Sequence, residues 1–365
     1  MTSAFSSSHA EHLTDFFSGK QYRRIEPPVL QPTRIFTELS GEDLRRRLFL
    51  TQDQEGNDLC LRPEYTIPVA REHLRLNSRE IAQYFYMGPV FRFRNDGSGE
   101  FLQGGMELIG RKDEVAADAE CVAHALQALD YLQHSSPSVL FADMGLLTSV
   151  LDALKLSEAR KHHVMRHIIA EKNLDGGTSP DQTVGRKHAA LIDAIEKHDP
   201  DAVKAFIEDV FSIAGITHIG GRSTSQIAER FLTKTSDQAA LTQEQKQILD
   251  HYLSISGEPD DCVEKIRTFA QEAGLDIAPA ISEFETRTGF IASFKADLSC
   301  FRFDARFVRN MDYYTGFIFE IYSPFCDKPV AAGGRYNHLF RLLGADTMIP
   351  AVGCSFWLDR LQEKD

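Results

Sequence analysis

Residues 309–316 read RNMDYYTG, and the strand-like run FIFEIY follows at residues 317–322. The first stretch brings an arginine, an aspartate and two tyrosines together. If it is extended, alternate side chains share a face, so we expect Asp312 and Tyr314 on one side and Tyr313 on the other. A cation and a phenol beside one pocket suit a small zwitterion with a polar ring. The alternative is an ordinary tyrosine-rich strand, because tyrosine has a high β-propensity.

The composition is that of an ordinary globular protein. The chain has 365 residues, of which 42% are hydrophobic and 25% charged, and this length allows one large domain with an insertion, or two domains. The net charge is −13, and no basic footprint of the kind that binds nucleic acid is evident. The run Arg45-Arg46-Arg47 is better interpreted as a solvated helix face. The acidic balance therefore disfavours a nucleic-acid partner.

Nothing in the sequence indicates a membrane protein or a secreted one. The longest apolar runs are shorter than the ~20 residues that a membrane helix needs, and the serine-rich N-terminus has no apolar signal core. Six cysteines are scattered without a C-x-x-C pair, which is the pattern of reduced, mostly buried thiols. We therefore expect a cytoplasmic protein without a membrane partner.

Strand patterns occupy the two ends of the chain, and helical patterns occupy the middle. Pro27 and Pro28 suggest an edge strand or an interface segment, because proline cannot donate to a ladder. We predict an α+β fold on an antiparallel sheet, built from residues 1–140 and 290–365, with a largely helical insertion at 145–289. The expected elements are helices at 10–20, 68–76 and 116–133, a hairpin of 48–51 with 59–62, and aromatic-rich strands at 83–94 and 100–110.

Three further segments carry side chains that could line one pocket. In the segment LRPEYT, Glu64 and Thr66 share one side of an extended chain and could hold an ammonium group. In the segment QGGME, Gln103 and Glu107 share one face of a strand, and the paired glycines leave room for a ligand near the backbone. The third segment is GGRY, residues 333–336.

A histidine-rich stretch at residues 161–167 offers a candidate metal site. His163 and His167 stand four residues apart beside His162, and such a pair could bind zinc on one face of a helix. No third ligand has a suitable spacing, so a solvated helix face is the better interpretation. We expect neither a metal nor a cofactor.

Taken together, these segments resemble the catalytic core of histidyl-tRNA synthetases, which are class II synthetases built on an antiparallel sheet. The resemblance extends from about residue 10 to the end, and the segments keep the family's order. The segment at Pro28 resembles the first, dimer-forming motif, GPVFR at residues 88–92 the second, and residues 353–360 the third. The signatures LRPExT, RxxDYY and AGGRY are specific to the histidine branch.

This resemblance implies a histidine-binding site. Glu64, Thr66 and Gln103 would hold the α-amino group, and Arg309, with Gln103, would hold the α-carboxylate. Glu107 would accept from a ring N–H, and two phenols would reach the imidazole. Charge-assisted hydrogen bonds of this kind reject ligands that leave the groups unpaired. The implied set comprises Glu64, Thr66, Gln103, Glu107, Arg309, Tyr313, Tyr314 and Tyr336.

The ATP half of the site departs from the family's pattern. Where the second motif has a glutamate after Arg92, this chain has Arg94, and the loop that follows is short and lacks phosphate-binding basic residues. In the third motif Arg360 is kept, but a glycine that lies against adenosine has become Trp357. We interpret these four residues as a vestigial ATP site. We also expect no C-terminal anticodon-binding domain and no tRNA partner.

This combination resembles a second family, the synthetase-like regulatory subunits of ATP phosphoribosyltransferase, the first enzyme of histidine biosynthesis. It implies a non-catalytic subunit that forms a dimer, assembles with a short-form catalytic subunit that requires it for activity, and senses histidine for feedback inhibition. The alternatives are a divergent histidine-activating enzyme and a histidine-binding scaffold for another partner. A relaxed remnant of an ancestral pocket is a further alternative, since Tyr65 stands where the family has glycine.

Overall fold

The computed structural model of the chain describes residues 6–361 except 41, 77–80, 95–96, 135, 159, 162–163, 166, 169–240, 295 and 310–312. Its contacts divide the chain into two compact units, residues 1–150 with 250–365, and residues 151–249. The first unit contains both sheets and every residue of the expected site. The expected insertion at 145–289 remains a prediction. Within the first unit, α13 (Ala278–Ser293) packs against α5 (Glu114–Tyr131).

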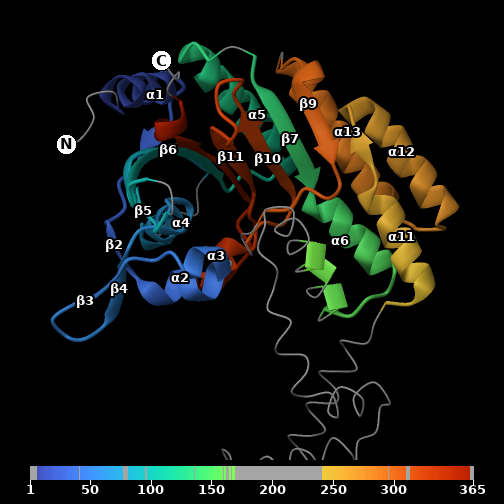
Figure 1. Ribbon diagram of the computed structural model, residues 1–365, viewed down its shortest axis with the longest axis horizontal. Coiled ribbons are helices and arrows are strands. Elements are labelled where there is room, and N and C mark those ends of the chain that lie inside the picture. Colours follow the sequence, from blue (N-terminus) through green and yellow to red (C-terminus); the bar gives the residue numbers. More distant parts are fainter. Residues whose placement is uncertain are drawn as a thin grey trace, which may run out of the picture. The chain divides into compact units, whose positions relative to one another are not determined.

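A nine-stranded sheet forms the centre of the first unit (Figure 1). Its strands lie in the order β1-β5-β6-β12-β11-β10-β7-β9-β8. Neighbouring strands are antiparallel except in the pairs β1–β5 and β7–β9, which are parallel. The strands are β1 (Arg23–Arg24), β5 (Ala82–Phe91), β6 (Glu100–Ile109), β7 (Ser138–Asp143), β8 (Ser256–Gly257), β9 (Phe301–Asp304), β10 (Phe317–Tyr322), β11 (Ala331–Arg335) and β12 (Ala351–Trp357).

A second, three-stranded antiparallel sheet has the order β2-β4-β3. The prediction of a hairpin is confirmed: β3 pairs with β4, and Asp53 Oδ1 closes the turn by accepting from the backbone N–H groups of Glu55 and Asn57, as aspartate commonly does in turns. The proline-bearing segment leads into β2, which lies at the edge of this sheet. The strands are β2 (Leu30–Pro32), β3 (Leu50–Gln52) and β4 (Asp58–Leu61).

The predicted helices of the first unit are confirmed within a few residues. The second of them starts at Thr66, so Pro68 falls in its first turn, where proline costs little because the N–H groups there have no helical partner. The three predicted helices are α1 (Ser6–Gly19), α4 (Thr66–Arg75) and α5. The remaining described helices are α2 (Thr33–Leu39), α3 (Glu42–Arg45), α6 (Met144–Ala153), α11 (Gln243–Leu253), α12 (Pro259–Glu272), α13, α14 (Leu339–Leu342), and the short 3₁₀ turns η1 (Leu298–Cys300) and η2 (Leu358–Arg360).

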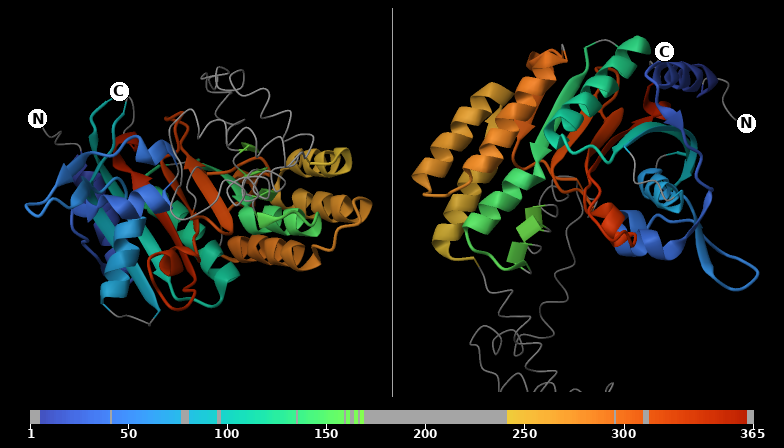
Figure 2. Two further views of the ribbon diagram at one scale, coloured as in Figure 1. Left: turned by 90° about the horizontal axis from the view of Figure 1, so that it is seen from below. Right: turned by 180° about the vertical axis from the view of Figure 1, so that it is seen from behind.

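The two faces of the large sheet carry different side chains. On one face a Cβ on Gly104 would stand 2.5 Å from Met87 Cε and 3.5 Å from Leu13 Cδ1 of α1. On the same face Phe356 of β12 lies 6.0 Å from Phe17 of that helix, measured between ring centroids. Helices α1 and α5 cover this face. On the other face β5 and β6 curve around α4 (Figures 1 and 2). Because successive residues of a strand point to opposite faces, Glu107 and its neighbours two residues away point toward α4.

Candidate functional site

Glycines make the floor of the candidate site. Glu107 of β6 lies directly across from Gly353 of β12, and Gly353 lies across from Gly334 of β11. A Cβ on Gly353 would stand 1.5 Å from Glu107 Oε2, and one on Gly105 would stand 2.2 Å from the hydroxyl of Tyr86. Any side chain at these positions would therefore displace the polar groups, which explains the glycines physically.

The carboxylate of Glu107 is the centre of the site. The residue is 1% exposed. It accepts from Thr66 Oγ1 at 3.0 Å, from the hydroxyl of Tyr336 in a short contact, and from the hydroxyl of Tyr86 at 3.5 Å. In the described part of the chain its side-chain donors are thus hydroxyl groups. Burial raises the pKa of Glu107 to about 8, because the charged form is poorly solvated there.

A second buried carboxylate, that of Glu64, stands at the start of α4. It accepts from the backbone N–H of Thr66 at 2.6 Å and of Ile67 at 2.9 Å, so it occupies the positive end of the helix dipole. Burial raises the pKa of Glu64 to about 7. The expectation that Glu64 and Thr66 lie on an extended chain is wrong, because Thr66 already belongs to α4. The helix nevertheless turns the Thr66 hydroxyl toward Glu107.

The tyrosines gather above Glu107, although not as a strand would place them. Tyr313 and Tyr314 precede β10, so the expected alternation of these two side chains is wrong, and Asp312 lies outside the described residues. The ring of Tyr313 lies 4.9 Å from that of Tyr314 and 5.9 Å from that of Tyr336. Burial raises the pKa of Tyr314 to about 12, so its phenol is neutral near pH 7.

Arg309 and Gln103 border the same region. Arg309 Nη1 lies 3.8 Å from Glu320 Oε1 and donates to the carbonyl of Phe319 at 3.3 Å, and its guanidinium lies 5.6 Å from the ring of Tyr314. Gln103 is 2% exposed, and its side-chain oxygen has no hydrogen-bond partner among the described atoms. A buried acceptor without a partner is costly, and a ligand that donates a hydrogen bond would remove that cost.

The expected ATP residues are engaged with the protein itself. Arg94 Nη1 pairs with Asp359 Oδ2 at 2.6 Å. Arg360 donates to the carbonyl of Pro329 at 2.6 Å, and its guanidinium lies 4.4 Å from the indole of Trp357. Trp357 is 7% exposed. The pKa of Arg92 is lowered to about 10, chiefly by burial and then by the positive charge of Arg94.

Several residues of the site were not predicted from the sequence. Tyr86 and Ser355 lie on the same face as Glu107, and their hydroxyls are 2.7 Å apart. Tyr65 stacks on Tyr86 with ring centroids 4.3 Å apart and an angle of 9°. A Cβ on Gly88 would stand 2.4 Å from the Tyr65 hydroxyl. The signal in the sequence is the spacing of Tyr84, Tyr86 and Gly88, which occupy every second position of β5 and so share the face that looks toward α4.

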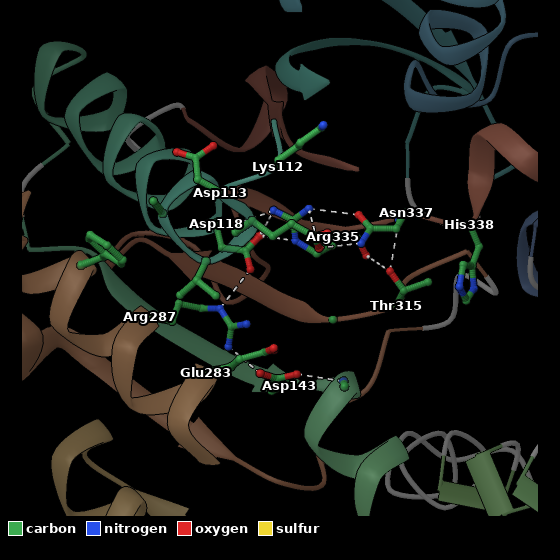
Figure 3. Close-up of a pocket in the computed structure, with 16 residues that line it drawn as sticks. Lys112, Asp113, Asp118, Asp143, Glu283, Arg287, Thr315, Arg335, Asn337 and His338 are labelled. Carbon is green, nitrogen blue, oxygen red and sulfur yellow. Dashed lines mark hydrogen bonds and ion pairs between the residues drawn. The ribbon is translucent and has the colours of Figure 1, made fainter. Parts of the chain in front are cut away.

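A separate cavity of about 570 Å³ opens on the other face of the sheet (Figure 3). Buried charges line it: Arg287 of α13 pairs with Asp143 of β7, and also with Asp118 of α5 at 3.0 Å. Asp118 pairs in turn with Arg335 of β11 at 2.7 Å. The signature AGGRY thus sends its arginine to this face, whereas its tyrosine reaches Glu107 on the other.

Among the described residues, no group of three or more histidine, cysteine, aspartate or glutamate side chains is arranged to hold a metal ion. His162 and His163 lie outside the described residues. Likewise, none of the described helices combines the length and the apolar character needed to cross a membrane.

The chain is similar to two groups of known proteins. A family model described as histidyl-tRNA synthetase matches residues 2–213 and 224–361. An ATP phosphoribosyltransferase regulatory subunit from Mesorhizobium japonicum is 37% identical over 372 residues, covering 99% of this chain and 98% of that one. A protein of the same name from a Chelativorans species is 36% identical over 369 residues, again covering 99% and 98%.

Solved structures share the fold at lower identity. A crystal structure from Bacillus halodurans, described as an ATP phosphoribosyltransferase regulatory subunit/histidyl-tRNA synthetase, has a TM-score of 0.70 and 23% identity over 98% of this chain and 78% of that chain. A histidyl-tRNA synthetase from a Nostoc species has a TM-score of 0.67 and 18% identity over 98% and 70%. These structures agree with the predicted α+β fold of a class II synthetase.

Proposed function

This chain belongs to the histidyl-tRNA synthetase family and, within it, to the ATP phosphoribosyltransferase regulatory subunits, and from that premise we propose that it binds histidine as a regulatory signal. The chain is a regulatory subunit of ATP phosphoribosyltransferase, an enzyme of histidine biosynthesis. Its role in that enzyme is non-catalytic, and its partner is the catalytic subunit. The finer features are proposals: a short-form catalytic partner, self-association as a dimer, and the absence of a tRNA partner.

The buried carboxylate of Glu107 carries the histidine proposal. It is surrounded by hydroxyls and stands near a second buried carboxylate, that of Glu64. Two buried carboxylates destabilise each other unless protons or a cation balance them. Histidine offers an ammonium group and a ring N–H, both of which donate to such acceptors. Gln103 supplies a further acceptor without a partner, and Arg309 a cation for the ligand's carboxylate.

The residues at the expected ATP site support a role in which this chain does not convert histidine to its adenylate. Adenylate formation requires a bound triphosphate whose charge is neutralised by positioned donors. Arg94 Nη1 pairs with Asp359, while Arg94 Nη2 has no hydrogen-bond partner among the described atoms. The guanidinium of Arg360 lies against the indole of Trp357, which takes up space beside it. We therefore propose that this chain has kept the amino-acid half of the ancestral site and uses it for sensing.

Titration calorimetry tests the histidine site. We expect wild type to bind histidine, and Glu107→Gln to bind it at least about tenfold more weakly, a loss of about 1.4 kcal/mol, because the substituted amide carries no charge. The matched control is Glu264→Gln on the surface of α12, which should bind as wild type does. Millimolar histidine that produces no heat with folded wild-type protein would refute the sensor proposal.

A second assay separates sensing from catalysis. We expect the purified chain to show no histidine-dependent exchange of pyrophosphate into ATP. Clear exchange would establish the alternative of a divergent histidine-activating enzyme. Co-purification with a short phosphoribosyltransferase chain would support the partner, and a complex that is inactive without this chain would support the requirement for it.

A further inference from the structure

Two segments carry the tyrosines that cover Glu107, and hydrogen bonds join these segments directly. Thr315, which follows Tyr314, donates its N–H to the carbonyl of Arg335 at 2.8 Å. Asn337, which follows Tyr336, donates its N–H to Thr315 Oγ1 at 3.1 Å. The side-chain oxygen of Asn337 also accepts from the N–H of Ala351 at the start of β12.

The joined segments are anchored on the other face of the sheet (Figure 3). Arg335 is 4% exposed. Its Nε donates to Asp118 at 2.8 Å, its Nη2 to the carbonyl of Glu114 at 2.7 Å, and its Nη1 to Asn337 Oδ1 at 3.0 Å. Asn337 in turn donates to the Glu114 carboxylate at 2.7 Å. Both Asp118 and Glu114 belong to α5, so this helix holds the segment rigidly.

The chain passes from the anchored face to the site within one residue. Arg335 ends β11 and points toward α5, while the next side chain, Tyr336, donates to Glu107. The backbone N–H of Tyr336 donates to the carbonyl of Ala351 at 2.8 Å. The direction of the Tyr336 phenol is thus fixed by backbone on one side and by the anchored arginine on the other.

If Asp118, Arg287 and Arg335 served only to stabilise the fold, the neutral side chains of Thr315 and Asn337 would not be needed. The ion pairs of Asp118 with Arg287 and Arg335 are complete without Thr315 or Asn337. The two neutral side chains add a link between the Tyr314 segment and the Tyr336 segment. That link joins two segments whose tyrosine rings both lie beside the ring of Tyr313, at 4.9 Å and 5.9 Å.

We propose that Thr315, Arg335 and Asn337 act as positioning residues, a clamp that holds the Tyr336 phenol against Glu107 and thereby sets the geometry for ligand binding. As far as it concerns histidine, this inference rests on the proposed function. The part that concerns Tyr336 and Glu107 is a property of the free protein. The two parts are therefore tested by different measurements.

The test compares Thr315→Val, which keeps the shape but removes the acceptor for Asn337, with Thr315→Ser, which keeps the hydroxyl. In free protein labelled with ¹³C at glutamate carboxyls, NMR follows the titration of Glu107. A phenol that donates to a carboxylate lowers its pKa, so we expect a higher Glu107 pKa in Thr315→Val and in Tyr336→Phe. Thr315→Ser should titrate as wild type does. The double variant Thr315→Val with Tyr336→Phe should match Tyr336→Phe alone, since both changes remove one interaction.

Histidine affinity supplies the second measurement. We expect Thr315→Val to bind histidine about fivefold more weakly, the fold-change that the loss of one hydrogen bond produces. Ile266→Val, a buried change in α12 far along the chain from the clamp, controls for lost stability and should bind as wild type does. A Glu107 titration that is unchanged in Thr315→Val but shifted in Tyr336→Phe would overturn the clamp. Absence of histidine binding by wild type would refute the sensor proposal, and the Glu107 titration would still decide the clamp.

Discussion

At the level of single residues, the site is a place where burial and charge oppose each other. Glu64 and Glu107 are both nearly inaccessible to water, and burial raises both of their pKa values, to about 7 and about 8. Backbone N–H groups solvate the first carboxylate and hydroxyls solvate the second. We therefore expect the free protein near pH 7 to hold a proton here, which the proposed cationic ligand would replace.

This protonation predicts how stability depends on pH. Glu107 titrates near 4.5 when unfolded and about 8 when folded, so the folded state binds more protons between these values. Its contribution to stability is complete below about pH 4.5 and is lost as the pH rises to about 8. We expect the free energy of unfolding of wild type to fall, relative to Glu107→Gln, by up to about 1.4 kcal/mol per pH unit in this window.

Urea unfolding at pH 5, 6, 7 and 8 measures this difference. Groups far from Glu107 titrate equally in both proteins, so subtracting the two curves leaves the contribution of Glu107 together with its interaction with Glu64. Parallel curves for wild type and Glu107→Gln would contradict the assignment of a raised pKa to this residue.

At the level of elements, strands β6 and β12 form the floor of the candidate site because Glu107 of β6 lies opposite a residue without a side chain, Gly353 of β12. The alternation of side chains along β6 could be predicted from the sequence, and so could the shared face of Gln103 and Glu107. The register that places Gly353 opposite Glu107 could not, because strand pairing depends on contacts between segments far apart in sequence. Strand β7 was not predicted, and the helix at Thr66 was expected to begin two residues later. The charged network of Asp118 and Arg335 was missed for the same reason as the register.

The pairing of Glu107 with a glycine gives an element-level prediction. A Cβ at Gly353 would overlap Glu107 Oε2 and also approach the carbonyl of Met106 at 2.7 Å. We expect Gly353→Ala to displace the carboxylate, to cost roughly 1–3 kcal/mol of stability as overpacked substitutions do, and to weaken histidine binding more than tenfold. Chemical denaturation and calorimetry would measure the two effects.

The matched control for this change is Gly289→Ala. Gly289 lies within α13 on its exposed side, and an added Cβ meets no atom within 4 Å. Alanine there should stabilise the protein by roughly 0.5–1 kcal/mol, because glycine is a poor helix former, and histidine binding should not change. If Gly353→Ala were as well tolerated as Gly289→Ala, the close packing of β6 on β12 would play no part in the site.

At the level of the whole molecule, sequence signatures predicted a histidine-binding site, and the departures around them predicted the non-catalytic role that the names of the curated relatives support. Trp357 and Arg94 were recognisable as departures because they change size and charge at positions that the resemblance to histidyl-tRNA synthetases assigns to nucleotide contact. The clamp through Thr315 and Asn337 was not recognisable, since a threonine beside a strand and an asparagine after one are common in loops. The proposed role of these two residues depends on the contact between the segments that carry them, which the sequence alone does not show.

The last prediction concerns the complex with the catalytic subunit. If histidine bound to this chain regulates its partner, the coupling is a free energy shared by the two sites, and it must be reciprocal. If histidine changes the partner's affinity for its substrate by a certain factor, the substrate must change the affinity for histidine by the same factor. Such factors are typically about 5 to 150. Calorimetry of histidine binding to the complex, with and without saturating substrate, measures one factor, and substrate titrations with and without histidine measure the other.

A complex built with Glu107→Gln should assemble, because the side chain is buried inside this chain, yet lose its response to histidine. If that complex is inhibited by histidine as strongly as the wild-type complex, the regulatory histidine binds elsewhere, and the pocket around Glu107 is not the sensor.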